Sequence, residues 1–219
     1  MWHGVEDKTL KEALQVLEEV CTIRPMTNED LIWVWHTRNE PDTLQKVYLT
    51  TTPASEEAFI NEVRTWVASF VFCETKEGAP VGYGFLNNPT AFGGVNFGVY
   101  IAPPHRMKGY AIFGGAQMLY YAFYPMNCRM VYCDVIATNR LSLNTLLKHH
   151  FKTEGVLRDY FEYGGRCADL VILTLHRADY PCLLQTAVEE AKRFMAYQRR
   201  HQPQDTTGLI TVPPVGYDV

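Results

Sequence analysis

Arg106-Met107-Lys108-Gly109-Tyr110-Ala111 is the stretch from which the fold of this chain is interpreted. It follows an apolar run that ends at Pro103-Pro104, and it opens a segment with helical spacing. A strand, a basic glycine turn and a helix form a pocket for an anion, because the first amides of a helix lack intrahelical partners and carry partial positive charge. Gly109 lets a ligand approach the backbone, and Arg106 and Lys108 add full charges. The stretch predicts a pyrophosphate cradle; the alternative is an ordinary strand-to-helix turn with solvated basic residues.

These residues resemble the coenzyme A signature of the GNAT superfamily of N-acetyltransferases, which is written Arg/Gln-x-x-Gly-x-Gly/Ala. Arg106, Gly109 and Ala111 stand at its fixed positions. A second match lies downstream, where the family's late helix often reads Asn-x-x-Ser/Ala and then, after a fixed gap, Lys/Arg-x-Gly-Phe. With that gap kept, this chain has Asn139-Arg140-Leu141-Ser142 and Lys148-His149-His150-Phe151.

The two ends of the matching region are similar to the branch that includes ribosomal-protein alanine and spermidine acetyltransferases. Residues 22–26 and 28–30 give a strand, Arg-Pro, a short loop, Asp and a helix, which is a frequent opening in that branch. At the other end, Glu154-Gly155 precedes an apolar strand at 168–173. The resemblance covers roughly residues 20–178.

The resemblance implies an α/β (α+β) fold for residues 20–178: a mixed, mostly antiparallel sheet with a splayed strand pair, flanked by helices. Helical spacing of apolar residues adds an N-terminal helical extension at 1–19 and a C-terminal helix at 179–200. Residues 201–219 are predicted to be a flexible tail. Three roles stay open for the terminal helices, which could cover the sheet, build a homodimer or bind a partner.

Apolar periodicity and turn residues predict the individual elements. Thr27 or Asn28 caps a helix that runs to Arg38, and Ser55 opens a helix whose apolar face extends to Trp66-Val67. The segment between these helices is predicted to be a loop with a short helical piece. The strands are predicted at about 21–26, 70–75, 80–87, 94–101, 129–137, 155–163 and 168–176, and the other helices at about 8–20, 108–122, 141–150 and 181–200.

The resemblance also implies the chemistry, in which an amine attacks the thioester of acetyl-CoA directly in a ternary complex, without a covalent enzyme intermediate. The acceptor would be a protein N-terminus, a lysine or a small amine. The splayed strand would hold the pantetheine arm along Val99, Tyr100 and Ile101, and an amide at Val99 or Tyr100 would stabilise the oxyanion. Asn139 would bond the pantetheine region, and Ser142 would bond the thioester sulfur or relay a proton. The structural alternatives are a helix N-cap for Asn139 and a hydroxyl bonded to its own helix for Ser142.

The general base is not evident from the sequence. Many family members carry Glu on the splayed strand, but here that strand offers Asn96 and Tyr100 and no acid. Tyr100 is the first candidate for a site residue, and a core aromatic with a satisfied hydroxyl is its alternative. Glu74, Asp134 and His105 are candidate bases elsewhere, although residues of these types are more often solvated or structural than catalytic bases. A chain of waters is a further route for the proton.

Two departures from the family pattern keep a second hypothesis open. Many members carry a Tyr that protonates the leaving thiolate, where this chain has Leu146, and the Gly before Phe is His150 here. The second hypothesis is a non-catalytic GNAT-fold protein that binds or regulates through its terminal helices.

Aromatic and acidic residues lie in the helices that would border the acceptor site. Trp33, Trp35 and Trp66 either shape a pocket or belong to the core. Acidic residues there favour a cationic amine, although acids are also common at helix starts for capping reasons. These acids are Glu29, Asp30, Glu56 and Glu57.

Composition narrows the classes of protein. The 219 residues are 47% apolar and 20% charged, which is enough to bury a core. A net charge of −4 argues against a general nucleic-acid binder and against an enzyme acting on a nucleobase. The six cysteines form no C-x-x-C pair, so no metal site is predicted, and most look like buried free thiols. With no signal-peptide pattern and no apolar run of about 18 residues, we expect a cytoplasmic protein without a membrane segment.

Overall fold

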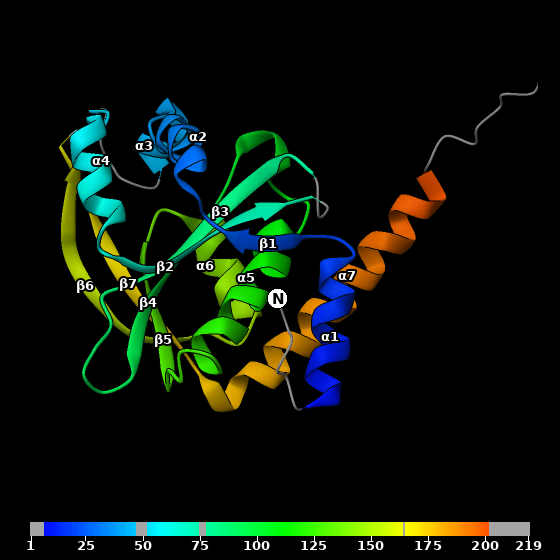
Figure 1. The fold of residues 1–219 in the computed structure, drawn as a ribbon. Coiled ribbons are helices and arrows are strands. Elements are labelled where there is room, and N and C mark those ends of the chain that lie inside the picture. The colour runs from blue at the N-terminus through cyan, green and yellow to red at the C-terminus, as the bar shows by residue number, and fades with distance from the viewer. Residues whose placement is uncertain (1–6, 47–51, 75–77, 164, 202–219) are drawn as a thin grey trace, which may run out of the picture.

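The computed structural model describes residues 7–46, 52–74, 78–163 and 165–201 (Figure 1). The strands are β1 (Thr22–Pro25), β2 (Trp66–Cys73), β3 (Pro80–Asn87), β4 (Gly94–Ile101), β5 (Met130–Ile136), β6 (Lys152–Tyr163) and β7 (Arg166–His176). The α-helices are α1 (Lys8–Glu18), α2 (Asn28–Arg38), α3 (Pro41–Lys46), α4 (Glu56–Val63), α5 (Tyr110–Phe123), α6 (Arg140–Lys148) and α7 (Tyr180–His201). Two short 3-10 helices, η1 (Pro103–His105) and η2 (Arg177–Asp179), precede α5 and α7.

The strands form one seven-stranded sheet in the order β1-β2-β3-β4-β5-β7-β6. All neighbouring strands are antiparallel except β4 and β5, which are parallel. The α/β fold with a mixed, mostly antiparallel sheet, predicted from the resemblance, is therefore confirmed.

The two faces of the sheet carry two separate cores. The main core lies between the sheet and α1, α5 and α7, and α5 is buried nearly all round, as its apolar sequence predicts. The second core is smaller and lies under α2 and α4, around Val34, Phe59, Tyr83 and Tyr100. Figure 1 shows α2, α3 and α4 grouped on one side of the sheet and α1, α5 and α7 on the other. Tyr100 of β4 belongs to the second core, whereas Val95 and Phe97 belong to the main core. Side chains of even-numbered residues on β4 therefore face the α2–α4 side.

Side-chain caps fix the starts of several helices. The side chain of Asp7 accepts hydrogen bonds from backbone amides at the start of α1, and Ser55 does the same for α4. Thr27 and Asp30 form a capping box at α2, and Asp30 also pairs with Arg24 at 2.7 Å. That pairing, together with the cap, lowers the pKa of Asp30 to about 2.

The helix predicted from Ser55 ends earlier than expected, which corrects the sequence-based prediction. α4 stops at Val63, and Trp66 already belongs to β2. The ring of Trp66 stacks on Phe85 of β3, with ring centroids 4.5 Å apart. The apolar spacing typical of a helix continues to Trp66, but this residue gains more by pairing with β3. The aromatic stack forms only when Trp66 lies in the sheet.

Strands β4 and β5 separate after a short paired stretch. They pair only from Gly94↔Met130 to Asn96↔Tyr132, while β4 remains paired with β3 to its end and β5 with β7. The predicted splayed pair is confirmed. Gly98 marks a close approach and no bulge: a Cβ there would lie 2.3 Å from the ring of Phe85, and the β3–β4 register is unbroken.

The terminal elements follow the sequence closely. The β6–β7 hairpin is long, and residue 164 between its strands lies outside the described residues. The tail predicted at 201–219 also lies outside them except for His201, which is the last residue of α7. Cys21, Cys73, Cys128 and Cys133 are buried free thiols, while Cys167 and Cys182 are exposed. Within the described ranges, no helix is both long enough and apolar enough to cross a bilayer.

Candidate active site

The turn before α5 has the backbone geometry of an anion cradle. Gly109 is the N-cap of α5 with φ +85°, and Met107 is also left-handed at φ +65° with its side chain 82% exposed. Among the described residues, none accepts a hydrogen bond from the backbone amides of 107–111. A Cβ on Gly109 would lie 2.5 Å from the ring of Phe113, so packing as well as conformation selects glycine here.

Arg106 is turned toward β4. Its Nε donates to the carbonyl oxygen of Ile101 at 3.0 Å, and its Nη2 donates to the hydroxyl of Tyr100 at 3.3 Å. The guanidinium carbon lies 5.5 Å from the centre of the Tyr100 ring. Arg106 therefore holds the cradle turn against the end of the splayed strand. Lys108 is exposed at the same turn.

The wedge between β4 and β5 has an acid at its closed end. Asp134 lies on β5 two residues beyond Tyr132, the last residue that pairs with β4. The side-chain amide of Asn96 on β4 donates to its Oδ2 at 3.4 Å. Asp134 is exposed, yet its pKa is raised above the usual value of 3.8 because neighbouring parts of the chain displace part of the water that would solvate its carboxylate. Of the candidate bases, Asp134 is the one at the point where the two strands separate.

The other two candidate bases flank Tyr110 on the α5 side of the sheet. Glu74 accepts a hydrogen bond from the Tyr110 hydroxyl at 2.6 Å. Burial is the larger cause of the raised pKa of Tyr110, and the hydrogen bond to this carboxylate is the second. His105 packs edge-on against Tyr110, and no described residue bonds its buried Nδ1. Both therefore lie on the opposite face of the sheet from the even-numbered side chains of β4.

Tyr100 is a buried aromatic with a bonded hydroxyl. The residue is 7% exposed and stacks on Tyr83 at 5.3 Å. Its hydroxyl lies 2.8 Å from that of Thr43 on α3 and donates to Glu40 at 3.4 Å. Burial, the largest effect, raises the pKa of Tyr100. Glu40 and Thr43 were not predicted as site residues, because they carry no motif and lie in a segment predicted to be mostly loop.

The residues predicted around α6 lie at its N-cap, within the helix and in the turn that follows it. Asn139 is the N-cap of α6, and its Oδ1 accepts from the backbone amide of Ser142 at 3.2 Å. Ser142 is half-buried in the first turn, and Leu146 packs against the main core. His150 adopts φ +68°, the left-handed conformation that glycine favours, so the turn after α6 forms without that glycine.

The aromatic residues near the expected acceptor site belong to the second core. Trp33 packs edge-on against Tyr83 at 6.4 Å, and Trp66 stacks on Phe85. The indole nitrogen of Trp35 donates to the carbonyl of Ala54 at 2.9 Å. The acids of this region divide in two. Asp30 is bonded within its capping box, whereas an exposed set remains, consisting of Glu29, Glu56 and Glu57.

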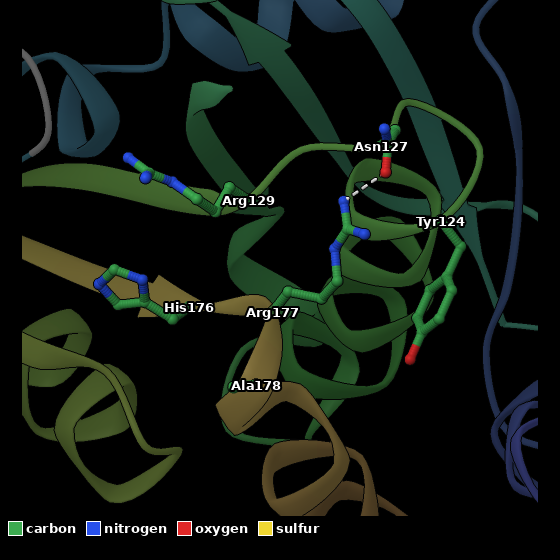
Figure 2. Close-up of a pocket in the computed structure, with 6 residues that line it drawn as sticks. All are labelled: Tyr124, Asn127, Arg129, His176, Arg177 and Ala178. Carbon is green, nitrogen blue, oxygen red and sulfur yellow. Dashed lines mark hydrogen bonds between the residues drawn. The ribbon is translucent and has the colours of Figure 1, made fainter. Parts of the chain in front are cut away.

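A separate hollow lies beside the start of β5 (Figure 2). It measures about 690 Å³ and is lined by Tyr124, Asn127, Arg129, His176, Arg177 and Ala178. Arg177 donates to the carbonyl of Cys128 at 2.9 Å and to the side chain of Asn127 at 2.8 Å. These bonds tie the start of β5 to the end of β7. The hollow is at the paired end of β4 and β5, away from the cradle, and we do not assign it to the reaction.

Comparison with known proteins agrees with this geometry. The family model described as the acetyltransferase (GNAT) domain matches residues 21–152. A spermidine N-acetyltransferase from Vibrio cholerae, solved in complex with CoA and spermine, is similar in fold with a TM-score of 0.66 at 21% identity, over 74% of this chain and 98% of that one. A phosphinothricin N-acetyltransferase, assigned as putative, gives 0.64 at 21% identity, over 71% and 98%. No curated protein matched by sequence.

The family model covers more than half of the chain, and the solved structures share its fold. The cradle at 106–111 and both splayed strands, β4 and β5, lie inside the matched region. The chain therefore belongs to the GNAT acetyltransferase family and is an acyltransferase whose co-substrate is acetyl-CoA.

Proposed function

We propose that this protein transfers the acetyl group of acetyl-CoA to a primary amine by direct attack in a ternary complex. The observation that carries the proposal is the open wedge between β4 and β5, which begins at the cradle and ends at Asp134. A donor lying in this wedge has its phosphates at one end and its thioester near the other.

The backbone would hold the donor. The free amides of 107–111 bind the pyrophosphate, which the partial positive charge of the α5 N-terminus also favours. The pantetheine arm lies along residues 97–101 of β4, an edge that has no partner on the β5 side. An amide at Val99 or Tyr100 then donates to the thioester oxygen as it becomes an oxyanion. Asn139 and Ser142 border the arm from the start of α6.

Asp134 would prepare the nucleophile. Its carboxylate takes a proton from the ammonium form of the acceptor, and a raised pKa makes it a stronger proton acceptor. The neutral amine attacks the thioester carbon, and the nitrogen of the tetrahedral intermediate loses its extra proton to solvent. The intermediate then collapses to the amide by breaking the carbon–sulfur bond. Leu146 cannot protonate the departing thiolate, so we assign that proton to the Ser142 hydroxyl as a relay from solvent.

The acceptor approaches from the side of α2 and α4. The exposed acids there, including Glu29, Glu56 and Glu57, favour a cationic amine over a neutral one. The solved neighbours include a spermidine N-acetyltransferase in complex with spermine, which makes a polyamine the first small amine to try. Protein N-termini and lysine side chains are the other acceptor classes.

The proposal is tested by following free thiol release from acetyl-CoA in the presence of spermidine, an N-terminal peptide and a lysine-containing peptide, with mass spectrometry of the products. We expect amine-dependent release and one acetylated amine. Tight binding of acetyl-CoA without acetylation of any of the three classes would favour the non-catalytic alternative, for which Leu146 is the main observation.

A further inference from the structure

Helix α7 passes the N-terminus of α5 and continues beyond it. Near the start of α7, Tyr180 packs against Phe123 at the end of α5. Near its other end, Phe194 packs against Tyr110 and Phe113, with ring centroids 6.2 and 6.0 Å apart. The two helices are therefore antiparallel. The seven residues after Phe194 extend about 10 Å past the cradle at about 1.5 Å per residue, and Figure 1 shows this end of α7 projecting from the body of the molecule.

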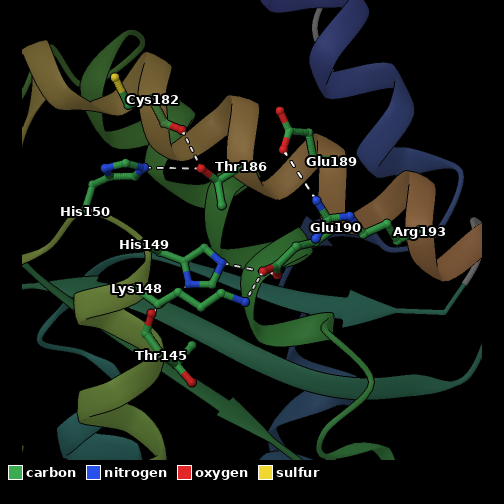
Figure 3. Close-up of polar contacts among 9 residues, drawn as sticks. All are labelled: Thr145, Lys148, His149, His150, Cys182, Thr186, Glu189, Glu190 and Arg193. Carbon is green, nitrogen blue, oxygen red and sulfur yellow. Dashed lines mark hydrogen bonds and ion pairs between the residues drawn. The ribbon is translucent and has the colours of Figure 1, made fainter.

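Contacts with α6 fix the rotation of α7 about its axis (Figure 3). Glu190 pairs with Lys148 and lies 3.2 Å from Nε2 of His149, a buried residue at the end of α6. One turn earlier, the hydroxyl of Thr186 lies 3.2 Å from Nε2 of His150. The side of α7 that carries Thr186 and Glu190 thus faces the end of α6.

An aromatic pair continues this same side past the cradle. Thr186, Glu190, Phe194, Tyr197 and His201 are spaced by three or four residues, so they lie along one stripe of the helix. Tyr197 is 62% exposed, and its ring stacks on His201 with centroids 4.1 Å apart and planes 26° apart. The stripe therefore passes from the α6 contact, over the N-terminus of α5, to an exposed stacked pair.

Positive charge flanks the stripe. Within the described residues, Arg193 makes one long 3.9 Å pair with Glu189, and the two side chains are 79% and 53% exposed. Arg200 is exposed and makes no ion pair with any residue in the described ranges. By helical spacing both arginines lie on the same flank of the Tyr197 stripe. The stripe thus combines an aromatic surface with charges suited to a phosphate.

We propose that this end of α7 forms the nucleotide half of the donor site, with the Tyr197–His201 pair stacking on the adenine ring of coenzyme A and Arg193 and Arg200 meeting its 3′-phosphate. The inference rests on the proposed function, because it starts from a pyrophosphate held at the cradle. The adenosine attached to that pyrophosphate would then lie outside the wedge, beside the α5 N-terminus against which Phe194 of α7 packs. Aromatic side chains accept any base face by stacking. α7 lies outside the region that the family model matches.

The test is isothermal titration of the full chain with coenzyme A and with 4′-phosphopantetheine, which lacks the adenosine half. We expect Tyr197→Ala to weaken coenzyme A binding about tenfold, as expected for the loss of one base–aromatic stack, and to leave 4′-phosphopantetheine binding unchanged. Tyr197→Phe should bind as the wild type does. The matched control is Tyr160→Ala, because Tyr160 is 56% exposed on β6, far from α7 in the sequence.

A second comparison separates the phosphate from the base. The double variant Arg193→Ala, Arg200→Ala should lose about tenfold in affinity for coenzyme A, and less for 3′-dephospho-coenzyme A. Equal coenzyme A binding by wild type and Tyr197→Ala would overturn the inference while leaving the cradle in place. An equal loss of affinity for coenzyme A and for 4′-phosphopantetheine in Tyr197→Ala would also overturn it, because α7 would then support the structure of the site without contacting the adenosine. A wild type that binds neither ligand would remove the proposed function and this inference together.

Discussion

Asp134 carries the proton transfer in the proposed reaction, and its position can be tested at the residue scale. Asp134→Asn should lower kcat by about 10²-fold or more, as for the loss of a general base, with acetyl-CoA affinity unchanged. Because the base must be deprotonated, the wild-type rate should rise with pH through the raised pKa of Asp134. Steady-state kinetics against pH measure both effects.

The variant should lack this rise with pH, because it has no carboxyl group to titrate there. Asp159→Asn is a matched control, since Asp159 is an exposed aspartate on β6. If Asp134→Asn keeps the wild-type rate and pH profile, the proton leaves by another route, and a chain of waters becomes the better explanation.

Tyr100 stabilises the fold through its hydroxyl. Tyr100→Phe removes one hydrogen bond to Thr43, which is fully buried, and one to Arg106. We expect the free energy of unfolding to fall by about 1 kcal/mol, the usual net value of a buried hydrogen bond. Urea denaturation measures it, with Tyr160→Phe as an exposed control. A drop in kcat without loss of stability would instead make the hydroxyl catalytic.

At the scale of elements, the contact between α6 and α7 contains an ion-pair cluster around Glu190. Lys148 and His149 lower the pKa of Glu190, although burial alone would raise it. A carboxyl whose pKa is lower in the folded state than in the unfolded state stabilises the fold when the pH is above its unfolded-state pKa. This contribution is lost as the pH falls through the folded-state pKa. Glu190→Gln should therefore cost about 1 kcal/mol at pH 7.

The difference between Glu190→Gln and the wild type should shrink as the pH falls below 4.5, the ordinary pKa of this carboxyl. Thermal unfolding at several pH values measures it. Glu189→Gln, one residue away with a long exposed ion pair, is the control and should change little. A pH-independent difference would mean that Glu190 acts by packing.

The elements also show where sequence reasoning succeeds and fails. Caps and periodicity located α2 and α5 closely, because Thr27 and Gly109 are local signals. The boundary between α4 and β2 could not be found locally, since the stack of Trp66 on Phe85 exists only once β2 and β3 pair. In the same way, Glu40 reaches Tyr100 from a segment 60 residues away, and no spacing rule predicts such a contact.

At the scale of the whole molecule, the sequence was sufficient for the fold because three short motifs occur in the right order. The cradle motif and the splayed strand that it implies are both local features of residues 94–111. The base was harder to predict, because Asp134 becomes distinctive only when β4 and β5 separate beside it. Helix α7 carries no motif, and its relation to the cradle depends on how it packs on α5.

The most direct test of the account is isothermal titration with acetyl-CoA of the wild type and of Gly109→Glu and Met107→Glu. Gly109→Glu adds charge and bulk beside Phe113, and Met107→Glu adds charge at a side chain that is 82% exposed, so the fold should tolerate the second change. Gly155→Glu is the matched control, because a Cβ there meets nothing within 4 Å. We predict micromolar binding by the wild type and the control, and its loss in both cradle variants. Wild-type affinity in a folded Met107→Glu would contradict the cradle, and no binding by the wild type would contradict the account as a whole.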